Sequence, residues 1–186
     1  MQITFFRRYS ISIISLLVYF MMLIQPSFGQ FHPVAKESSI IFTIHNFGFK
    51  VTGSLEAPQG DIRFSPDSLS NSYFRVTMKS ASINTDNNTR DEHLREEDYF
   101  DVKNYPLISF VSGSIQKAGN KGDFTAYGSL TIKNKTKDIQ LPFTAVKSGD
   151  GYLFTGSFKM NRRDFDIGGG STISNELTVD IKVLAR

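Results

Sequence analysis

The sequence predicts an all-β protein, an eight-stranded antiparallel barrel with one short helix near a barrel mouth. Three observations support this fold class. Most segments after residue 29 alternate apolar and polar residues with a period of two, which is typical of strands with one buried and one solvated face. Turn-forming sequences interrupt the alternation at roughly hairpin spacing. The chain contains 17 phenylalanines but no cysteine, so burial rather than disulfide bonds must hold the fold.

The predicted strands follow one another along most of the chain. Apolar or small residues occupy alternate positions in seven clear segments: 47–51, 62–64, 74–78, 124–132, 139–143, 154–160 and 177–183. Turns are predicted between strands at 58–60, 119–122, 134–137 and 148–151. The whole pattern gives about eight or nine strands, and about eight strands close a barrel that side chains or one small ligand fill. A two-sheet sandwich would alternate in the same way, so strand number alone favours closure.

The stretch after Ile83 departs from the alternation and predicts a short helix. Thr89 and Glu92 have the spacing of a capping box, and residues 92–100 can continue as about two helical turns. An ion pair four residues apart is predicted on this helix, between Asp91 and Arg95. Two of its side chains are expected to pack inward: Leu94 and Phe100. The helix would lie across one mouth of the barrel.

Residues 1–29 are predicted to be a secretory signal peptide. Two arginines precede an apolar run at 11–24, and small residues at 27–29 fit a signal-peptidase site. The alternative is a membrane anchor, but the run is shorter than the ~20 residues that a spanning helix needs. The mature protein would then be one domain, residues 30–186, without a membrane span and located in the periplasm or secreted.

The charge of the mature chain gives no sign of a nucleic-acid partner. Residues 1–29 carry two of the 21 basic residues, which leaves 19 against 18 acidic residues. No basic stripe accumulates along the sequence. The histidines are scattered without the paired spacing of metal ligands: His32, His45 and His93. We therefore expect no nucleic acid, no metal and no cofactor.

If the strands close, their apolar faces converge on one interior. The candidate wall residues are Phe42, Ile44, Phe49, Phe74, Val76, Met78, Phe110, Phe124, Leu130, Phe143, Phe154, Phe158, Val179 and Ile181. From the residues alone these side chains would be the ordinary core of a β domain that fills its own interior. A hollow interior would instead suit a long apolar ligand, which binds by removing its surface from water.

Two residues of the predicted helix are candidates for a polar role at the mouth. Arg90 offers a planar fork of donors that suits a phosphate head group, and His93 stands near it. A histidine beside carboxylates is also the raw material of acid–base catalysis. On a charged, solvated helix, however, such a cluster is more often structural. We therefore predict no catalytic residues.

Several separated motifs resemble the YceI family in order and spacing. They are SSIIFTIHNFG, FKVTGSLEAPQGDIRFSPD, SINTDNNTRDEHLREEDYFDVKNYPLISF, YGSLTIKNKTKDIQLPF and SFKMNRRDF. The resemblance covers essentially the whole mature chain and implies a lipocalin-like barrel, exported to the periplasm, with a polyisoprenoid or similar amphiphile inside. The segment GGGSTISNE is shorter than in many relatives, and Asp166 stands where a glycine is common, so the preferred lipid is left open.

The expected function is that of an exported, non-catalytic protein that sequesters or carries a long apolar amphiphile. An enzyme acting on a prenyl or other lipid substrate is the first alternative. A module with a filled core and a functional outer surface is the second. A homodimer is left open by the sequence.

Overall fold

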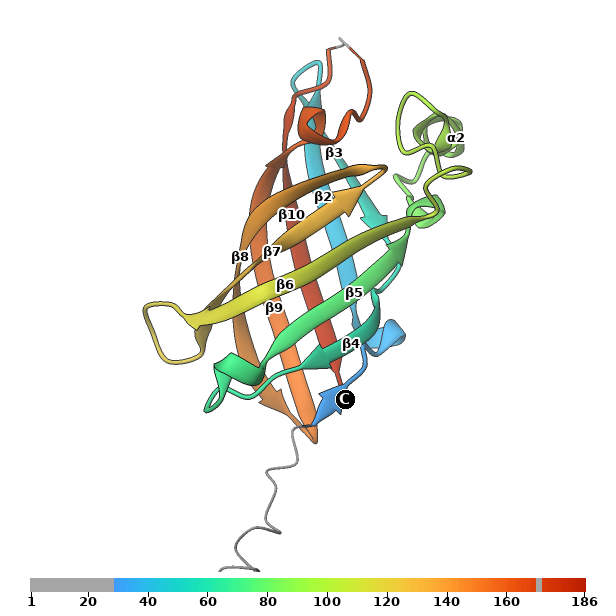
Figure 1. The fold of residues 1–186 in the computed structure, drawn as a ribbon. Helices are drawn as coiled ribbons and strands as arrows, with labels where there is room; N and C mark the ends of the chain where they lie inside the picture. The colour runs from blue at the N-terminus through green and yellow to red at the C-terminus, as the bar shows by residue number, and fades with distance from the viewer. Residues whose placement is uncertain (1–28, 170–171) are drawn as a thin grey trace, which may run out of the picture.

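The computed structural model describes residues 29–169 and 172–186, and in these residues ten strands form one antiparallel sheet (Figure 1). The order of the strands is β1-β4-β5-β6-β7-β8-β9-β10-β2-β3. Their bounds are β1 Gln30–Phe31, β2 Ser39–Asn46, β3 Phe49–Leu55, β4 Gln59–Arg63, β5 Tyr73–Lys79, β6 Leu107–Lys117, β7 Asp123–Ile132, β8 Lys135–Ser148, β9 Gly151–Asn161 and β10 Glu176–Ala185. The predicted signal peptide lies outside the described residues, apart from Gly29.

The all-β antiparallel fold is confirmed, whereas the predicted number of eight strands is wrong. Across the described parts of the chain there are ten strands. One reason is that β1 has only two residues, which is too short for an alternating pattern to reveal it. Its place in the sheet is fixed by pairing with β4, where Gln30 lies opposite Arg63 and Phe31 opposite Ile62.

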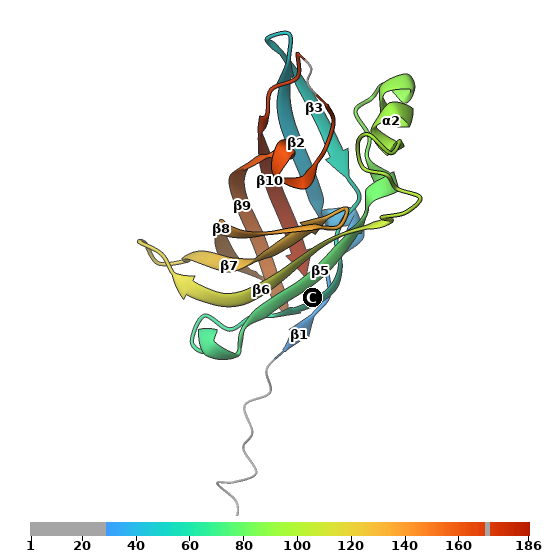
Figure 2. The same ribbon diagram turned by 45° about the horizontal axis from the view of Figure 1, so that its top comes forward.

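The sheet curls round so that each edge strand, β1 or β3, meets a segment that is not its neighbour in the strand order (Figures 1 and 2). At one edge, the backbone N–H of His32 donates to the Arg186 carbonyl at 2.8 Å, and the Arg186 N–H donates back at 3.1 Å. At the other edge, the N–H of Ser54 on β3 donates to the Asn84 carbonyl at 2.8 Å, and the Asn84 N–H donates back at 3.0 Å. Short backbone contacts rather than a continuous ladder therefore join the β1 edge to the end of β10 and the β3 edge to the segment after β5.

The two ends of the barrel differ in structure (Figure 1). The upper end in that view carries the helix α2 (Asn88–Arg95), the β2–β3 hairpin and the 3-10 turn η4 (Arg162–Phe165). The lower end carries β1 and the carboxyl terminus. The other 3-10 turns are η1 (Ala35–Glu37), η2 (Leu69–Asn71) and η3 (Ser80–Ser82).

The capping of α2 differs from the prediction based on Thr89. The helix begins earlier, and its N-cap is Asn87, whose side-chain oxygen accepts from the Arg90 N–H at 3.0 Å. Asparagine is among the strongest N-cap residues. The capping role that the Thr89–Glu92 spacing predicted for Thr89 therefore belongs to Asn87, and Thr89 lies inside the helix. The helix ends at Arg95, and residues 96–100 form a bend and turns instead of continuing the helix.

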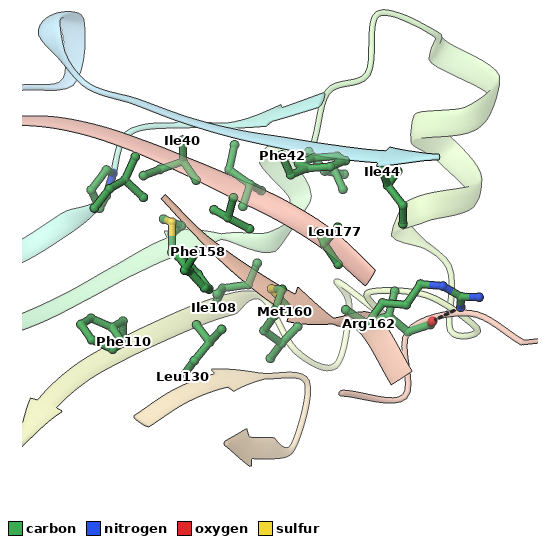
Figure 3. A pocket seen from close by; sticks show the side chains of 18 of the residues that line it. Ile40, Phe42, Ile44, Ile108, Phe110, Leu130, Phe158, Met160, Arg162 and Leu177 are labelled. Atoms are coloured by element: carbon green, nitrogen blue, oxygen red, sulfur yellow. Dashed lines mark hydrogen bonds between the residues drawn. The ribbon is translucent and has the colours of Figure 1, made fainter. Parts of the chain in front are cut away.

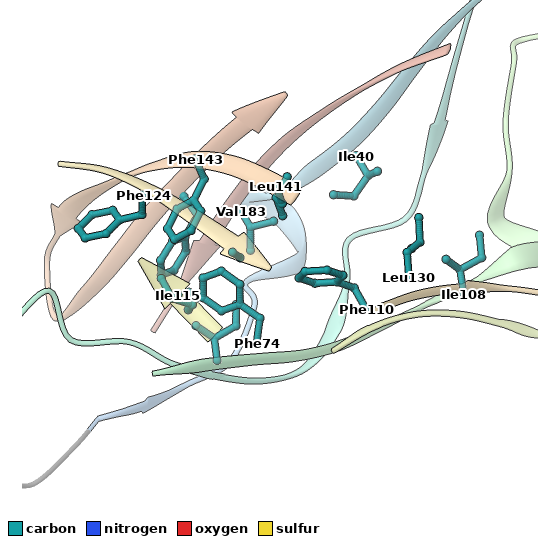
Figure 4. Close-up of a cluster of buried hydrophobic side chains, with 14 of the residues drawn as sticks. Ile40, Phe74, Ile108, Phe110, Ile115, Phe124, Leu130, Leu141, Phe143 and Val183 are labelled. Carbon is teal, nitrogen blue, oxygen red and sulfur yellow. The ribbon is translucent and has the colours of Figure 1, made fainter. Parts of the chain in front are cut away.

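The lower part of the barrel is packed with aromatic rings. Phe64 lies at the centre, with ring centroids 5.1 Å from Phe124, 5.2 Å from Tyr152 and 5.3 Å from Phe154. These four rings, together with Phe74 and Phe143, are called the aromatic plug below. Most of the contacts are edge-to-face, which aromatic rings prefer because of their quadrupoles. The plug closes the lower end, and the apolar core continues upward from it through Phe110 and Leu130 (Figure 4).

Candidate functional site

Above the aromatic plug the barrel interior is hollow (Figure 3). The centre of a water molecule can occupy a volume of about 230 Å³ in this cavity. Each of the strands β2 to β10 contributes to its wall, because alternate residues of a strand point to the same face of the sheet. On β10, for example, Leu177, Val179 and Ile181 line the cavity while Asp180 is exposed.

Most of the predicted wall residues do line this cavity. They are Phe42, Ile44, Phe74, Val76, Met78, Phe110, Leu130, Phe143, Phe154, Phe158, Val179 and Ile181. Three of them, Phe74, Phe143 and Phe154, also belong to the aromatic plug and form the floor of the cavity. The interior is therefore partly filled and partly hollow.

Two predicted wall residues lie elsewhere. Phe49 has the inward phase of β3, since Val51 lines the cavity, but it stands at the first position of the strand, beyond the wall, and is 77% exposed. Phe124 is buried within the aromatic plug and does not reach the cavity. Alternation gives the side of the sheet on which a residue lies, but not its depth along the barrel axis.

Several lining residues come from outside the strands. Leu94 and Phe100 line the cavity, as predicted for the helical region. The wall also includes side chains from irregular segments that the strand pattern did not reveal: Ile83, Tyr99, Ile167 and Ile173. No periodicity identifies such residues, because each stands alone in a loop or turn.

Polar side chains gather at the upper end of the cavity, here called the mouth. Among the described residues, the lining is apolar except for Asn46, Thr85, Arg90, Tyr99 and Arg162. All five come from the elements at the upper end: the tip of β2, the region of α2, and η4. The cavity therefore has an aromatic floor and a polar mouth.

Arg90 is held at the mouth by Thr85. Its Nε donates to Thr85 Oγ1 at 2.7 Å, and its Nη2 donates to the Thr85 carbonyl at 2.7 Å. Nη1 makes no hydrogen bond to any residue that the structure describes. Arg90 lines the cavity as predicted, whereas His93 is exposed and is not part of the lining. The prediction that both residues face the mouth is therefore wrong for His93.

Asp91 holds Thr85 in place by two hydrogen bonds and does not pair with Arg95. Its Oδ1 accepts from the Thr85 N–H at 2.9 Å and from the Thr85 hydroxyl, and both residues are only 4% exposed. Arg95 instead donates to the Ala81 carbonyl at 3.0 Å and to the Ile83 carbonyl at 2.9 Å. The predicted ion pair is replaced because the buried carboxylate has closer donors in the segment before the helix.

Arg162 is a buried cation beside the cavity and is 5% exposed. Its guanidinium donates to the carbonyls of Ile167 at 2.6 Å, Ser174 at 3.0 Å and Ile173 at 3.1 Å. Burial lowers the pKa of Arg162 below its ordinary value, and the charge of Arg163 lowers it further. Figure 3 shows Arg162 at the same end of the cavity as Ile44 and Leu177. It ties the segment after η4 to the barrel.

Within residues 29–169 and 172–186 no group of three or more potential ligands is placed to hold a metal ion. His32 lies 3.4 Å from Asp61 on the lower part of the barrel, and His45 is exposed on β2. In the same part of the chain, no helix is long and apolar enough to cross a membrane.

Comparisons with known proteins agree with this architecture. The YceI-like domain matches residues 31–185. A UPF0312 protein of Pseudomonas savastanoi pv. phaseolicola is 32% identical over 148 residues, which are 75% of this chain and 76% of its own length. The crystal structure of Burkholderia cenocepacia BcnA has a TM-score of 0.78 and 23% identity, covering 83% of this chain and 99% of BcnA.

A second structural neighbour is a polyisoprenoid binding domain from Saccharophagus degradans, implicated in plant cell wall breakdown. It has a TM-score of 0.67 at 11% identity and covers 84% of this chain and 97% of that domain. At these identities the two structures establish the fold. The fold and the cavity together define a lipocalin-like antiparallel barrel with an apolar interior. The chain belongs to the YceI family, as the sequence motifs indicated.

Proposed function

We propose that this protein binds a long apolar lipid of the polyisoprenoid type, with the tail in the barrel cavity, and sequesters or carries it without chemical turnover. The observation that carries the proposal is the one-ended apolar cavity, with the aromatic plug as its floor and polar groups only at its mouth. An apolar tail gains about 25 cal/mol for each Å² removed from water. The Saccharophagus degradans domain, described as polyisoprenoid binding, supports the ligand class by analogy of fold.

The mouth supports binding rather than catalysis. Among the described residues that line the cavity, the polar groups are an amide, a hydroxyl, a phenol and two guanidinium groups. The Asp91 carboxylate accepts from Thr85, is buried and is not part of the cavity lining. The described lining therefore contains neither an imidazole nor a carboxylate, the groups that most often act as general acid or base. Export through a signal peptide at residues 1–29 is part of the proposal, because it would place the protein where envelope lipids are available.

Native mass spectrometry of protein purified from its own host tests this function. We expect a species heavier than the mature chain by the mass of one lipid, and we expect organic extraction to remove that mass. Adding a prenyl lipid to the extracted protein should raise its melting temperature, because a ligand that binds only the folded state stabilises it. Purified protein without bound lipid, whose melting temperature prenyl lipids leave unchanged, would support the filled-core module instead. Conversion of a prenyl phosphate by the protein would support the enzyme.

A phosphate head group is expected to lie at Arg90. Replacing Arg90 by glutamine should weaken binding of a prenyl phosphate by about tenfold or more, since a hydrogen bond to a charged group contributes about 1.5–3 kcal/mol. Binding of the corresponding prenyl alcohol should change little. The measurement is a competition assay with both lipids on the same protein preparation.

Lys103→Gln is the matched control, because it removes one positive charge from an exposed residue outside the cavity lining. This variant should bind both lipids as the wild type does. Equal affinity of the Arg90→Gln variant and the wild type for the phosphate would exclude Arg90 as the head-group residue, while leaving the binding of the tail unaffected.

A further inference from the structure

The tip of the β2–β3 hairpin carries the two most exposed large apolar side chains among the described residues. Phe47 is 71% exposed and Phe49 is 77% exposed, and the pair is called the aromatic tip below. Neither residue belongs to the hydrophobic core cluster. The hairpin reaches out from the upper end of the barrel in both ribbon views (Figures 1 and 2). The aromatic tip therefore contributes little to the packing of the fold.

The backbone of the tip makes the presence of phenylalanine more unusual. Phe47 has φ +50° and Gly48 has φ +80°, so both residues that connect β2 to β3 are left-handed. Such a two-residue turn favours Asn-Gly or Asp-Gly, and a bulky residue in the left-handed region is strained. The chain thus holds an aromatic side chain where both backbone strain and exposure to water oppose it. Local conflicts of this kind point to function.

The tip is braced and not loosely attached. The Phe47 N–H donates to the Thr172 carbonyl at 3.3 Å, and Thr172 Oγ1 donates to Asn46 Oδ1 at 2.9 Å. Ser174 N–H donates to the His45 carbonyl at 2.8 Å. Asn46 itself lines the cavity. The wall of the cavity therefore continues directly into the aromatic tip, which stands at the rim of the mouth.

The charge of the hairpin is compatible with a phospholipid surface. His45 and Lys50 lie opposite each other across the hairpin, both are exposed, and residues 45–50 contain no acidic side chain. A lysine beside inserted aromatic rings can reach the lipid phosphates while the rings lie at the boundary with the acyl chains. Two exposed side chains are far fewer than the about 20–30 residues on each side of a stable protein interface. A bilayer therefore fits this feature better than a protein partner or a second copy.

We propose that the aromatic tip inserts into the surface of a phospholipid bilayer and brings the mouth of the cavity to the membrane. Phe47 and Phe49 enter the interfacial region, while Lys50 lies near the phosphate groups. Docking itself depends only on the tip. The consequence that lipid passes between bilayer and cavity rests on the proposed function. The two claims can be tested separately.

The experiment is co-sedimentation of the mature protein with vesicles of phosphatidylethanolamine and phosphatidylglycerol. The test variant combines Phe47→Asn with Phe49→Ser. Because asparagine suits the left-handed turn position, this variant should keep the wild-type melting temperature. We expect its partition coefficient onto vesicles to fall by about tenfold or more, since two exposed rings are removed from the membrane interface. Val146→Ser is the control, because Val146 is an exposed apolar residue on β8, and this variant should bind as the wild type does.

Three results would overturn the docking proposal. The first is wild-type protein that stays in the supernatant, and the second is a double variant that sediments with vesicles as the wild type does. The third is a wild type that is a dimer in analytical ultracentrifugation while the double variant is a monomer. The lipid load measured by native mass spectrometry separates docking from the proposed function. A double variant that loses vesicle binding but binds prenyl lipid in solution supports docking. Wild-type protein that binds vesicles yet takes up no lipid would support docking and contradict the carrier function.

Discussion

Replacing Val179 by tryptophan is expected to abolish lipid binding. Val179 lies on β10 between Leu177 and Ile181, in register with Phe158 on β9 and Phe42 on β2, and all five side chains line the cavity. An indole ring at this position would project into the cavity and take up space that the lipid tail needs. We expect the lipid recovered per protein molecule by organic extraction and mass spectrometry to fall by about tenfold or more, which requires an affinity loss of at least about 1.4 kcal/mol.

The matched control for this variant is Thr178→Trp. Thr178 is the neighbour of Val179 on β10 and is not part of the cavity lining, so the same ring is added on the other face of the sheet. This control should carry lipid as the wild type does. Because overpacking costs about 1–3 kcal/mol, the melting temperatures of both variants are measured alongside. A folded Val179→Trp protein with a full lipid load would place the ligand outside the barrel.

Replacing Arg162 by methionine is expected to lower the free energy of unfolding by about 3–5 kcal/mol. The substitution removes the guanidinium that donates to the carbonyls of Ile167, Ile173 and Ser174, of which Ile167 is buried. Each lost hydrogen bond costs about 1 kcal/mol, and a buried carbonyl left unsatisfied costs more. Although burial lowers the pKa of Arg162, arginine stays protonated in proteins, so the loss should be constant between about pH 5 and 9. Urea unfolding at several pH values measures it.

Arg163→Met is the comparison for this second experiment. Arg163 is exposed, and its Nη1 donates to the Gly168 carbonyl. Its replacement should cost about 1 kcal/mol or less, because exposed groups can exchange a protein partner for water. Hydrogen exchange should show the segment before β10 opening in the Arg162 variant but not in the Arg163 variant. Equal stability of the two variants would mean that the carbonyls find other partners.

The strands were predictable because alternation is a local property of the sequence. On β10, the positions from Leu177 to Ile181 gave both the strand and its inward face. The same rule placed Phe49 inside, and its phase is correct. Alternation does not show where the rim of the barrel lies, because the position of the rim depends on how far the neighbouring strands extend. Phe124 shows the opposite limit, since it lies deeper than the cavity, in the aromatic plug.

The polar residues at the mouth and their hydrogen-bond partners were harder to predict from the sequence than the strands. The helical spacing rule paired Asp91 with Arg95, but the buried Thr85 provides two donors that a rule restricted to the helix does not include. Arg90 was identified by its chemistry alone. Arg162 follows a strand in a run of charged residues, and nothing local shows that one of two adjacent arginines is buried. Its partners lie in the segment that returns to β10.

The aromatic plug has a consequence for how a guest molecule travels. Phe64 and its neighbouring rings fill the lower end, so the barrel is closed at that end and is not a through-channel. A hydrocarbon chain that slides in end-first must leave in reverse, so the part that enters last emerges first. The floor would also limit how far a chain can enter, so a chain longer than the cavity would extend past the rim, towards Arg90 and the hairpin bearing Phe47.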